Sequence, residues 1–151
     1  MKSLSKILLT GMILLMGGYL ATSQTYQPDQ IIGTWLNEDK DAHIEIYKEN
    51  NKYFGKIAWL KEPNETDTGL PKVDDENPDP ALQTRLVMGL VILKDFIFNG
   101  EDEWNKGTIY DPKSGKTYSC YMTFVEGQVL KIRGYIGFSW IGRTNLWTRV
   151  N

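Results

Sequence analysis

The feature that most constrains the fold of this chain is the alternation of apolar and polar residues in short segments separated by turn residues. In residues 43–48, Ile44 and Ile46 fall on one face, because successive side chains of a strand point to opposite sides. The 3.6-residue periodicity of helices is hard to find. A strand starting at Gly33 and seven further segments are therefore predicted, the seven being residues 43–48, 53–60, 89–98, 104–110, 116–125, 129–136 and 143–150.

Most connections between these segments are short, so consecutive strands are expected to be antiparallel neighbours. Eight such strands with one apolar face each predict an all-β fold, an antiparallel up-and-down barrel. Strand parity places the tight turns at one end of this barrel, called here the closed end. The more elaborate connections meet at the other end, called here the open end, and they are residues 38–41, 61–87, 111–115 and 137–142.

The first 23 residues have the pattern of a secretory signal peptide. Lys2 and Lys6 precede the almost wholly apolar residues 7–20, and small residues follow up to Ser23. A helix over that apolar run spans roughly 20 Å, which is shorter than the ~30 Å hydrocarbon core of a bilayer. We therefore expect cleavage between Ser23 and Gln24, a periplasmic or secreted protein, and no stable membrane insertion after cleavage. The alternative is a retained membrane anchor.

Removal of the signal peptide leaves residues 24–151, a length typical of one domain. The formal charge of −2 becomes −4 once the two lysines of the signal peptide are lost, and no basic run points to nucleic acid. Charged residues such as Glu45 and Lys131 at outward strand positions argue against a membrane-spanning barrel. Cys120 is the only cysteine, so packing alone must hold the domain. A monomer is the default expectation.

Four residues at the two ends of the strand series suggest how the closed end is sealed. Gly33 and Trp35 begin the first strand, and a tryptophan is large enough to plug a barrel. Trp147 and Arg149 are two residues apart in the last strand and so share a face. We predict that these residues close the barrel, with a guanidinium stacked on an indole and the glycine permitting a close chain entry or an unusual backbone angle.

The Gly-x-Trp motif with a late arginine resembles the lipocalin and calycin barrels. A broader resemblance covers nearly the whole mature chain, since "GTWLNEDKDAHIEIYK", "NPDPALQTR", "WNKGTIYDPKSGKTY" and "LKIRGYIG" occur in order and at the expected spacing. On these motifs the chain resembles the small exported bacterial proteins of domain of unknown function family 2147. The resemblance implies a signal peptide and a calycin-like barrel, but no established activity. Family members often have Pro after the equivalent of Arg85, where this chain has Leu86, which concerns the local loop shape.

No side chains single out a catalytic or metal site. His43, the only histidine, is expected to face solvent, and Cys120 is expected to be a buried thiol with a raised pKa. Residues 75–79 have the acidic spacing of a calcium loop, but Pro80 stands where that loop needs glycine. We predict no metal, no cofactor and no catalytic residue. An irregular calcium site and a carboxylate pair for glycoside chemistry stay open as alternatives.

Residues 61–87 form one long connection with four of the six prolines and a dense acidic cluster. Such loops are usually functional or disordered. We expect this loop to lie over the open end and to contribute little to folding. The predicted function is binding of a small apolar or amphipathic molecule in the barrel mouth beneath the loop. The residues proposed to line the site are Asn77, Arg85, Tyr110, Asp111, Tyr135 and Arg143.

Two other functions stay open at this point. One is a cell-envelope interaction module with a filled barrel, and the other is an enzyme that uses residues of the long loop. The apolar residues Phe138, Trp140 and Ile141 of the last turn bear on the first alternative, because they could contact a membrane or a partner. We expect them instead to fold over the mouth as part of the core.

Overall fold

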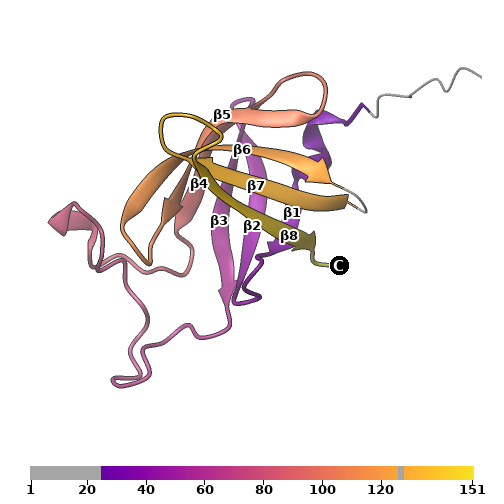
Figure 1. Cartoon of the computed structure of the whole chain (residues 1–151). Coiled ribbons are helices and arrows are strands. Elements are labelled where there is room, and N and C mark those ends of the chain that lie inside the picture. Colours follow the sequence, from indigo (N-terminus) through magenta and orange to yellow (C-terminus); the bar gives the residue numbers. More distant parts are fainter. Residues whose placement is uncertain (1–24, 126–127) are drawn as a thin grey trace, which may run out of the picture.

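The computed structural model describes residues 25–125 and 128–151, and its strands form one closed barrel (Figure 1). The predicted signal peptide lies outside the described residues. Neighbours in the chain pair antiparallel throughout, and β1 pairs with β8 to complete the ring. The strands are β1 (Gly33–Leu36), β2 (Ala42–Glu49), β3 (Lys52–Leu60), β4 (Val91–Phe98), β5 (Glu103–Asp111), β6 (Lys116–Val125), β7 (Val129–Tyr135) and β8 (Gly142–Arg149). The predicted up-and-down barrel of eight strands is thereby confirmed.

Short 3-10 helices accompany the barrel, among them η1 (Pro28–Ile31) before β1 and η2 (Pro80–Leu82) in the long connection between β3 and β4. Within the described residues, no helix has the length and the apolar character needed to cross a lipid bilayer.

The structure corrects the predicted bounds of β4, which begins at Val91 rather than at residue 89. Gly89 has a φ of 85° and donates its backbone N–H to the Ile57 carbonyl, so it belongs to the turn before the strand. Inside β4, Asp95 has a positive φ of 64°, and the pairing with β3 shifts register near this point. The apolar run therefore does not alternate regularly, because the irregularity changes which side chains face inward.

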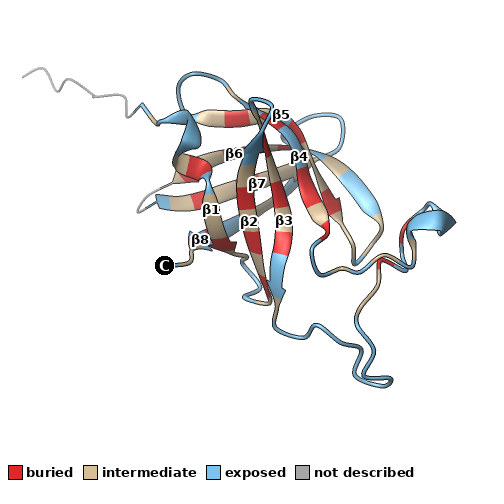
Figure 2. Ribbon diagram, turned by 180° about the vertical axis from the view of Figure 1, so that it is seen from behind, coloured by how far each residue is buried: buried red, intermediate tan, exposed pale blue. Residues whose placement is uncertain are grey.

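The core lies inside the barrel and is concentrated toward its closed end. Figure 2 shows buried residues as bands across the middle of the strands, with exposed residues at the loops. The fully buried side chains include Trp35, Phe96, Trp104, Met122 and Leu130, which come from five different strands. The barrel is thus held by packing of large inward-facing residues, as the lack of a disulfide requires.

Helix η1 seals the closed end. The indole N–H of Trp35 donates to the Ile31 carbonyl at 2.9 Å, and that of Trp104 donates to the Pro28 carbonyl at 2.9 Å. Asp29 of the same helix accepts from the Tyr53 hydroxyl at 2.6 Å. Sequence reasoning missed η1, because four polar and apolar residues before the first strand carry no periodic signal.

Arg149 covers Trp35 from outside. Its guanidinium carbon lies 4.2 Å from the centre of the Trp35 ring, and its nitrogens donate to the Ile32 and Gln30 carbonyls at 2.9 and 2.6 Å. Gly33 has a φ of 135°, and a Cβ at this position would collide with the Arg149 guanidinium. The glycine therefore serves both purposes considered for it, a close approach and a backbone angle that side chains disfavour.

Candidate functional site

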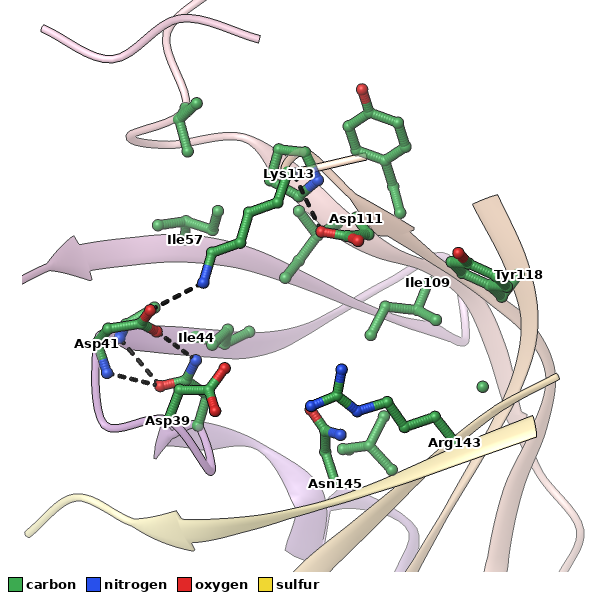
Figure 3. Close-up of a pocket in the computed structure, with 18 of the residues that line it drawn as sticks. Asp39, Asp41, Ile44, Ile57, Ile109, Asp111, Lys113, Tyr118, Arg143 and Asn145 are labelled. Atoms are coloured by element: carbon green, nitrogen blue, oxygen red, sulfur yellow. Dashed lines mark hydrogen bonds and ion pairs between the residues drawn. The ribbon is translucent and has the colours of Figure 1, made fainter. Parts of the chain in front are cut away.

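A cavity of about 1000 Å³ opens at the end of the barrel opposite η1. Residues of the β1–β2, β3–β4, β5–β6 and β7–β8 connections surround its entrance, as strand parity predicts. Figure 3 shows part of its lining, with isoleucines from different strands facing the same space. The apolar wall comprises Ala42, Ile44, Ile57, Leu60, Val87, Ile92, Ile109, Ile132 and Trp147.

Trp147 lies between this cavity and the packed closed end. It is 3% exposed, lines the cavity and pairs with Leu130 of β7. Its buried indole N–H has no hydrogen-bond partner among the residues that the structure describes. Trp147 therefore contributes to the cavity wall, whereas Gly33, Trp35 and Arg149 lie at the sealed end.

The rim of the cavity is charged, with seven carboxylates and four cations in the lining. Lys113 forms an ion pair with Asp41 at 3.0 Å, and Asn37 donates to the same Asp41 carboxylate. Burial alone would raise the pKa of Asp41. The hydrogen bonds from Asn37 and Lys113, the charge of Lys113 and a backbone hydrogen bond together outweigh burial and lower the pKa below its ordinary value. The carboxylates are Asp39, Asp41, Glu62, Glu65, Asp75, Glu76 and Asp111, and the cations are Lys61, Lys72, Lys113 and Arg143.

The structure brings together four of the six residues proposed from the sequence. Tyr110, Asp111, Tyr135 and Arg143 line the cavity, while Asn77 and Arg85 are not part of its lining. Asp111 also accepts hydrogen bonds within its own turn, from the Ser114 hydroxyl at 2.7 Å and from the Lys113 backbone.

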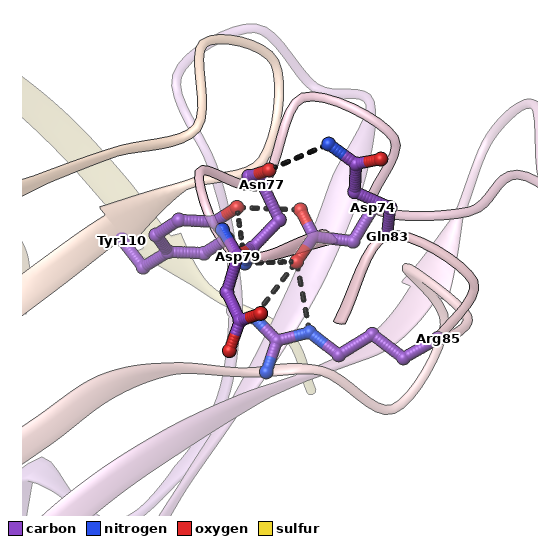
Figure 4. Close-up of polar contacts among 6 residues, drawn as sticks. All are labelled: Asp74, Asn77, Asp79, Gln83, Arg85 and Tyr110. Carbon is purple, nitrogen blue, oxygen red and sulfur yellow. Dashed lines mark hydrogen bonds and ion pairs between the residues drawn. The ribbon is translucent and has the colours of Figure 1, made fainter. Parts of the chain in front are cut away.

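Asn77 and Arg85 belong instead to a polar network around Asp74, which is fully buried (Figure 4). Asp74 accepts from the Tyr110 hydroxyl at 2.6 Å, from the Asn77 amide at 2.8 Å and from the Arg85 guanidinium at 2.7 and 2.8 Å. The Asn77 amide also donates to the Tyr110 oxygen at 3.0 Å. Both predicted ligand contacts are thus engaged with protein partners, which explains their absence from the cavity wall.

The pKa of Asp74 reflects this network. Burial on its own would raise the pKa, but hydrogen bonds from Tyr110, Asn77 and Arg85 outweigh burial and lower it below 3.8. The charge of Arg85 acts in the same direction. Asp74 is therefore an ionised hub that joins the long loop to β5.

The long loop has two structurally different parts. Residues 63–72 form an exposed hairpin, in which Asn64 and Pro71 make an isolated bridge, and Figure 1 shows it extending away from the barrel body. Residues 73–87 are fixed to the barrel by two contacts. Asp74 accepts a hydrogen bond from Tyr110 of β5. The Glu76 carbonyl packs so closely on Gly115 that a Cβ at position 115 would overlap the carbonyl oxygen. The expectation that the whole loop contributes little to folding is therefore revised for residues 73–87, which carry buried polar contacts.

The turn between β7 and β8 exposes aromatic side chains that the sequence analysis predicts to be buried. Phe138 is 59% exposed and Trp140 is 72% exposed, and their rings stack on each other at 4.5 Å with an interplanar angle of 7°. The Arg133 guanidinium fixes this turn by donating to the Ser139 and Trp140 carbonyls. The prediction that these aromatic side chains fold over the mouth as core is wrong, because they pair with each other and stay in contact with solvent.

Other candidate chemistry finds little support in the described part of the chain. No group of three or more His, Cys, Asp or Glu side chains in residues 25–125 and 128–151 is arranged to hold a metal ion. Burial raises the pKa of the Cys120 thiol to about 12, so the thiol stays protonated and unreactive at neutral pH. The imidazole of His43 packs against the Trp59 ring in a tilted arrangement, with ring centres 4.5 Å apart.

Sequence reasoning missed two kinds of residue at this end of the barrel. Asp74 was hidden in the acidic run, since sequence cannot show which of several neighbouring carboxylates is buried. Asn145 lines the cavity two residues beyond Arg143, and the alternation of β8 was the signal that places both on the inner face.

Comparison with known proteins agrees with the architecture. A solved structure described as "Protein HP1028 from the human pathogen Helicobacter pylori belongs to the lipocalin family" is similar, with a TM-score of 0.69 and 23% sequence identity, covering 85% of each chain. At this identity the likeness shows the lipocalin-like fold. A search of curated proteins finds no match.

The family model gives the sharper result. It matches residues 33–149, which comprise the complete barrel from β1 to the stacking arginine, Arg149. The chain therefore belongs to the bacterial family described as "Uncharacterized protein conserved in bacteria (DUF2147)", domain of unknown function family 2147.

Proposed function

We propose that this protein binds a small apolar or amphipathic molecule in the cavity at the open end of its barrel. The observation that carries the proposal is the cavity itself, whose volume of about 1000 Å³ is at the upper end of small-molecule sites. Its wall is largely aliphatic and its rim is polar, a division that suits a molecule with both characters. Helix η1 blocks the opposite end, so a ligand enters and leaves at the rim.

The long loop contributes to this entrance. The cavity lining includes Val73, Asp75 and Glu76 of its anchored part. It also includes Glu65 of the exposed hairpin and Glu62 just before it. Because the Asp74 network fixes residues 73–87 on β5, this part supplies a constant section of the rim. The exposed hairpin is then the part of the loop available to move when a ligand passes.

Binding is tested with N-phenyl-1-naphthylamine, an uncharged apolar dye that fluoresces in apolar surroundings. We expect saturable binding to the wild-type protein and a loss of at least about tenfold in affinity in Gly134→Leu. Gly134 lines the cavity, and its inward position has room for a Cβ in ordinary contact with Ile109 and Tyr118. A leucine there therefore fills space that the dye needs.

Thr148→Leu is the matched control, since it adds a leucine to the outward, exposed face of β8. Thermal unfolding of both variants checks that the barrel stays folded. Equal dye affinity in the wild type and Gly134→Leu, or no dye binding by the wild type, contradicts the proposal.

The alternative is an interaction module of the cell envelope, and one observation favours it. Phe138 and Trp140 form an exposed, stacked pair on a turn that Arg133 holds in place. Co-purification separates the two functions. A small molecule retained by the native protein and detected by native mass spectrometry favours binding, whereas repeated absence favours the module.

We also propose that the protein is exported, on the strength of the pattern in residues 1–23. The exported protein is expected to begin at Gln24. Intact-mass measurement of protein recovered from the periplasm or the medium checks this, and a full-length mass in that fraction overturns it.

A further inference from the structure

The inner face of β8 carries a run of polar side chains in a cavity whose walls are otherwise largely aliphatic. Arg143, Asn145 and Trp147 alternate along the strand and all line the cavity. Arg143 is the nearest of the three to the rim, and Trp147 is the deepest, roughly 13 Å further along the strand at about 3.3 Å per residue. Figure 3 shows Arg143 and Asn145 projecting from β8 into the same space as Ile44 and Ile109.

Arg143 differs from the other cations of the lining. Lys61 and Lys72 come from the long loop, and Lys113 comes from the β5–β6 turn and pairs with Asp41. Arg143 alone comes from a strand. None of the ion pairs found among the described residues includes it, although seven carboxylates belong to the same lining.

The surroundings of Arg143 leave space beside its side chain. The residue opposite Arg143 in β7 is Gly134, which lines the cavity and has no side chain to fill it. Asn145 supplies a second donor group on the same face of the strand. A guanidinium presents a planar set of donors that matches a carboxylate. Arg143 is exposed at the rim, so these donors are open to the head of a ligand that enters the cavity.

We propose that Arg143, assisted by Asn145, binds the carboxylate of the ligand, and that the apolar part of the ligand extends along β8 to Trp147. The proposed ligand class is therefore a carboxylate-bearing amphiphile held with its head near the rim. This inference rests on the proposed binding function. The excess of carboxylates over cations at the rim disfavours a head group with more than one negative charge, such as a phosphate monoester.

Displacement of N-phenyl-1-naphthylamine by three ten-carbon probes tests the inference. The probes are decanoate, decan-1-ol and decyltrimethylammonium, which share one tail and differ in head charge. We expect the wild type to bind decanoate about tenfold more tightly than decan-1-ol, as for a hydrogen bond to a charged group. In Arg143→Met this preference is expected to disappear while the affinity for decan-1-ol changes by less than about threefold.

Lys131→Met is the matched control. Lys131 lies on the outer face of β7, where its ammonium is 5.7 Å from the centre of the Tyr121 ring, so the variant removes the same charge outside the cavity. It is expected to keep the decanoate preference. Arg143→Lys is expected to retain part of it, because the charge stays and the planar donor pair is lost.

The possible outcomes separate this inference from the proposed function. Equal affinity for decanoate and decan-1-ol in the wild type, or an unchanged preference in Arg143→Met, overturns the carboxylate site and leaves the binding function standing. If the wild type binds decyltrimethylammonium more tightly than decanoate, the carboxylate site is also overturned. Head-group recognition is then assigned to the rim carboxylates. If the dye does not bind to the wild type at all, the binding function fails and the carboxylate site fails with it.

Discussion

Trp35→Ala is expected to lower the free energy of unfolding by about 3–5 kcal/mol, the range for loss of a buried large aromatic side chain. Trp35 is fully buried, so its removal leaves a cavity at the closed end. The variant also leaves the Ile31 carbonyl without its indole donor and removes the ring beneath Arg149. All three losses act on the seal formed by η1, which explains why a single substitution far from the open end has so large an expected effect.

Urea denaturation followed by far-UV circular dichroism measures this change, with Trp59→Ala as the matched control. Trp59 lies in β3, is 40% exposed and packs against the His43 ring in a tilted arrangement. Its replacement is expected to cost only about 1–2 kcal/mol, because a large part of the ring stays in contact with solvent and its aromatic contact with His43 contributes about 1 kcal/mol. Similar losses in both variants would show that burial at the closed end is not what makes Trp35 important.

A double-mutant cycle with Arg149→Ala tests the contact between the two residues. The single Arg149 variant is expected to cost less than Trp35→Ala, since the arginine covers the ring and satisfies two carbonyls but is only partly buried. The two effects are expected to be non-additive by about 0.5–3 kcal/mol. Additive effects would contradict a direct interaction across the 4.2 Å contact.

The architecture was predictable because two local signals determine it. Period-two alternation indicates the inner face of regular strands such as β2 and β7, and turn residues such as those of residues 111–115 indicate the connections. With strand number and antiparallel neighbours known, the grouping of connections at the two ends follows without further information. The bounds of β4 were less predictable, since an apolar run cannot show the irregularity at Asp95.

The candidate site was predictable where it depends on strand parity and not where it depends on loop structure. Arg143 and Tyr135 flank the last turn at the open end, and both line the cavity. Asn77 and Arg85 belong to a loop whose path the sequence does not reveal. Their engagement with Asp74 depends on contacts with Tyr110, which lies 36 residues from Asp74 in the chain. Contacts of this range leave no periodic trace in a single sequence.

Contacts between distant residues also explain why the structure differs from the sequence prediction at the β7–β8 turn and at helix η1. Phe138 and Trp140 were expected in the core because they are large and apolar, but a short turn held by Arg133 lets them stack on each other outside. Helix η1 was overlooked because its role comes from its backbone carbonyls. These carbonyls accept from tryptophans and an arginine that lie elsewhere in the chain, whatever side chains η1 carries.

Asp74→Ala is expected to lower the free energy of unfolding by about 3 kcal/mol, since removing one partner of a buried ion pair leaves the others unsatisfied. Tyr110, Asn77 and Arg85 all lose their shared acceptor. The value lies at the low end for buried pairs because the Arg85 side chain is 34% exposed and can reach water. Asp75→Ala is the matched control, as it removes the neighbouring carboxylate, which is exposed at the rim.

The pH dependence gives an independent test of the same hub. The folded-state pKa of Asp74 is lowered below 3.8, so its ionised form stabilises the fold above about pH 4 and this contribution is lost as pH falls through the folded-state pKa. The stability difference between the wild type and Asp74→Asn, which cannot titrate, is therefore expected to shrink below about pH 4. Urea denaturation curves at pH 7 and pH 3 measure it. A difference that stays constant with pH contradicts an ionised Asp74. The prediction for Asp74→Ala fails if this variant keeps the urea midpoint of the wild type and only becomes sensitive to protease within residues 73–87. In that case the Asp74 network fixes the rim of the cavity without stabilising the barrel.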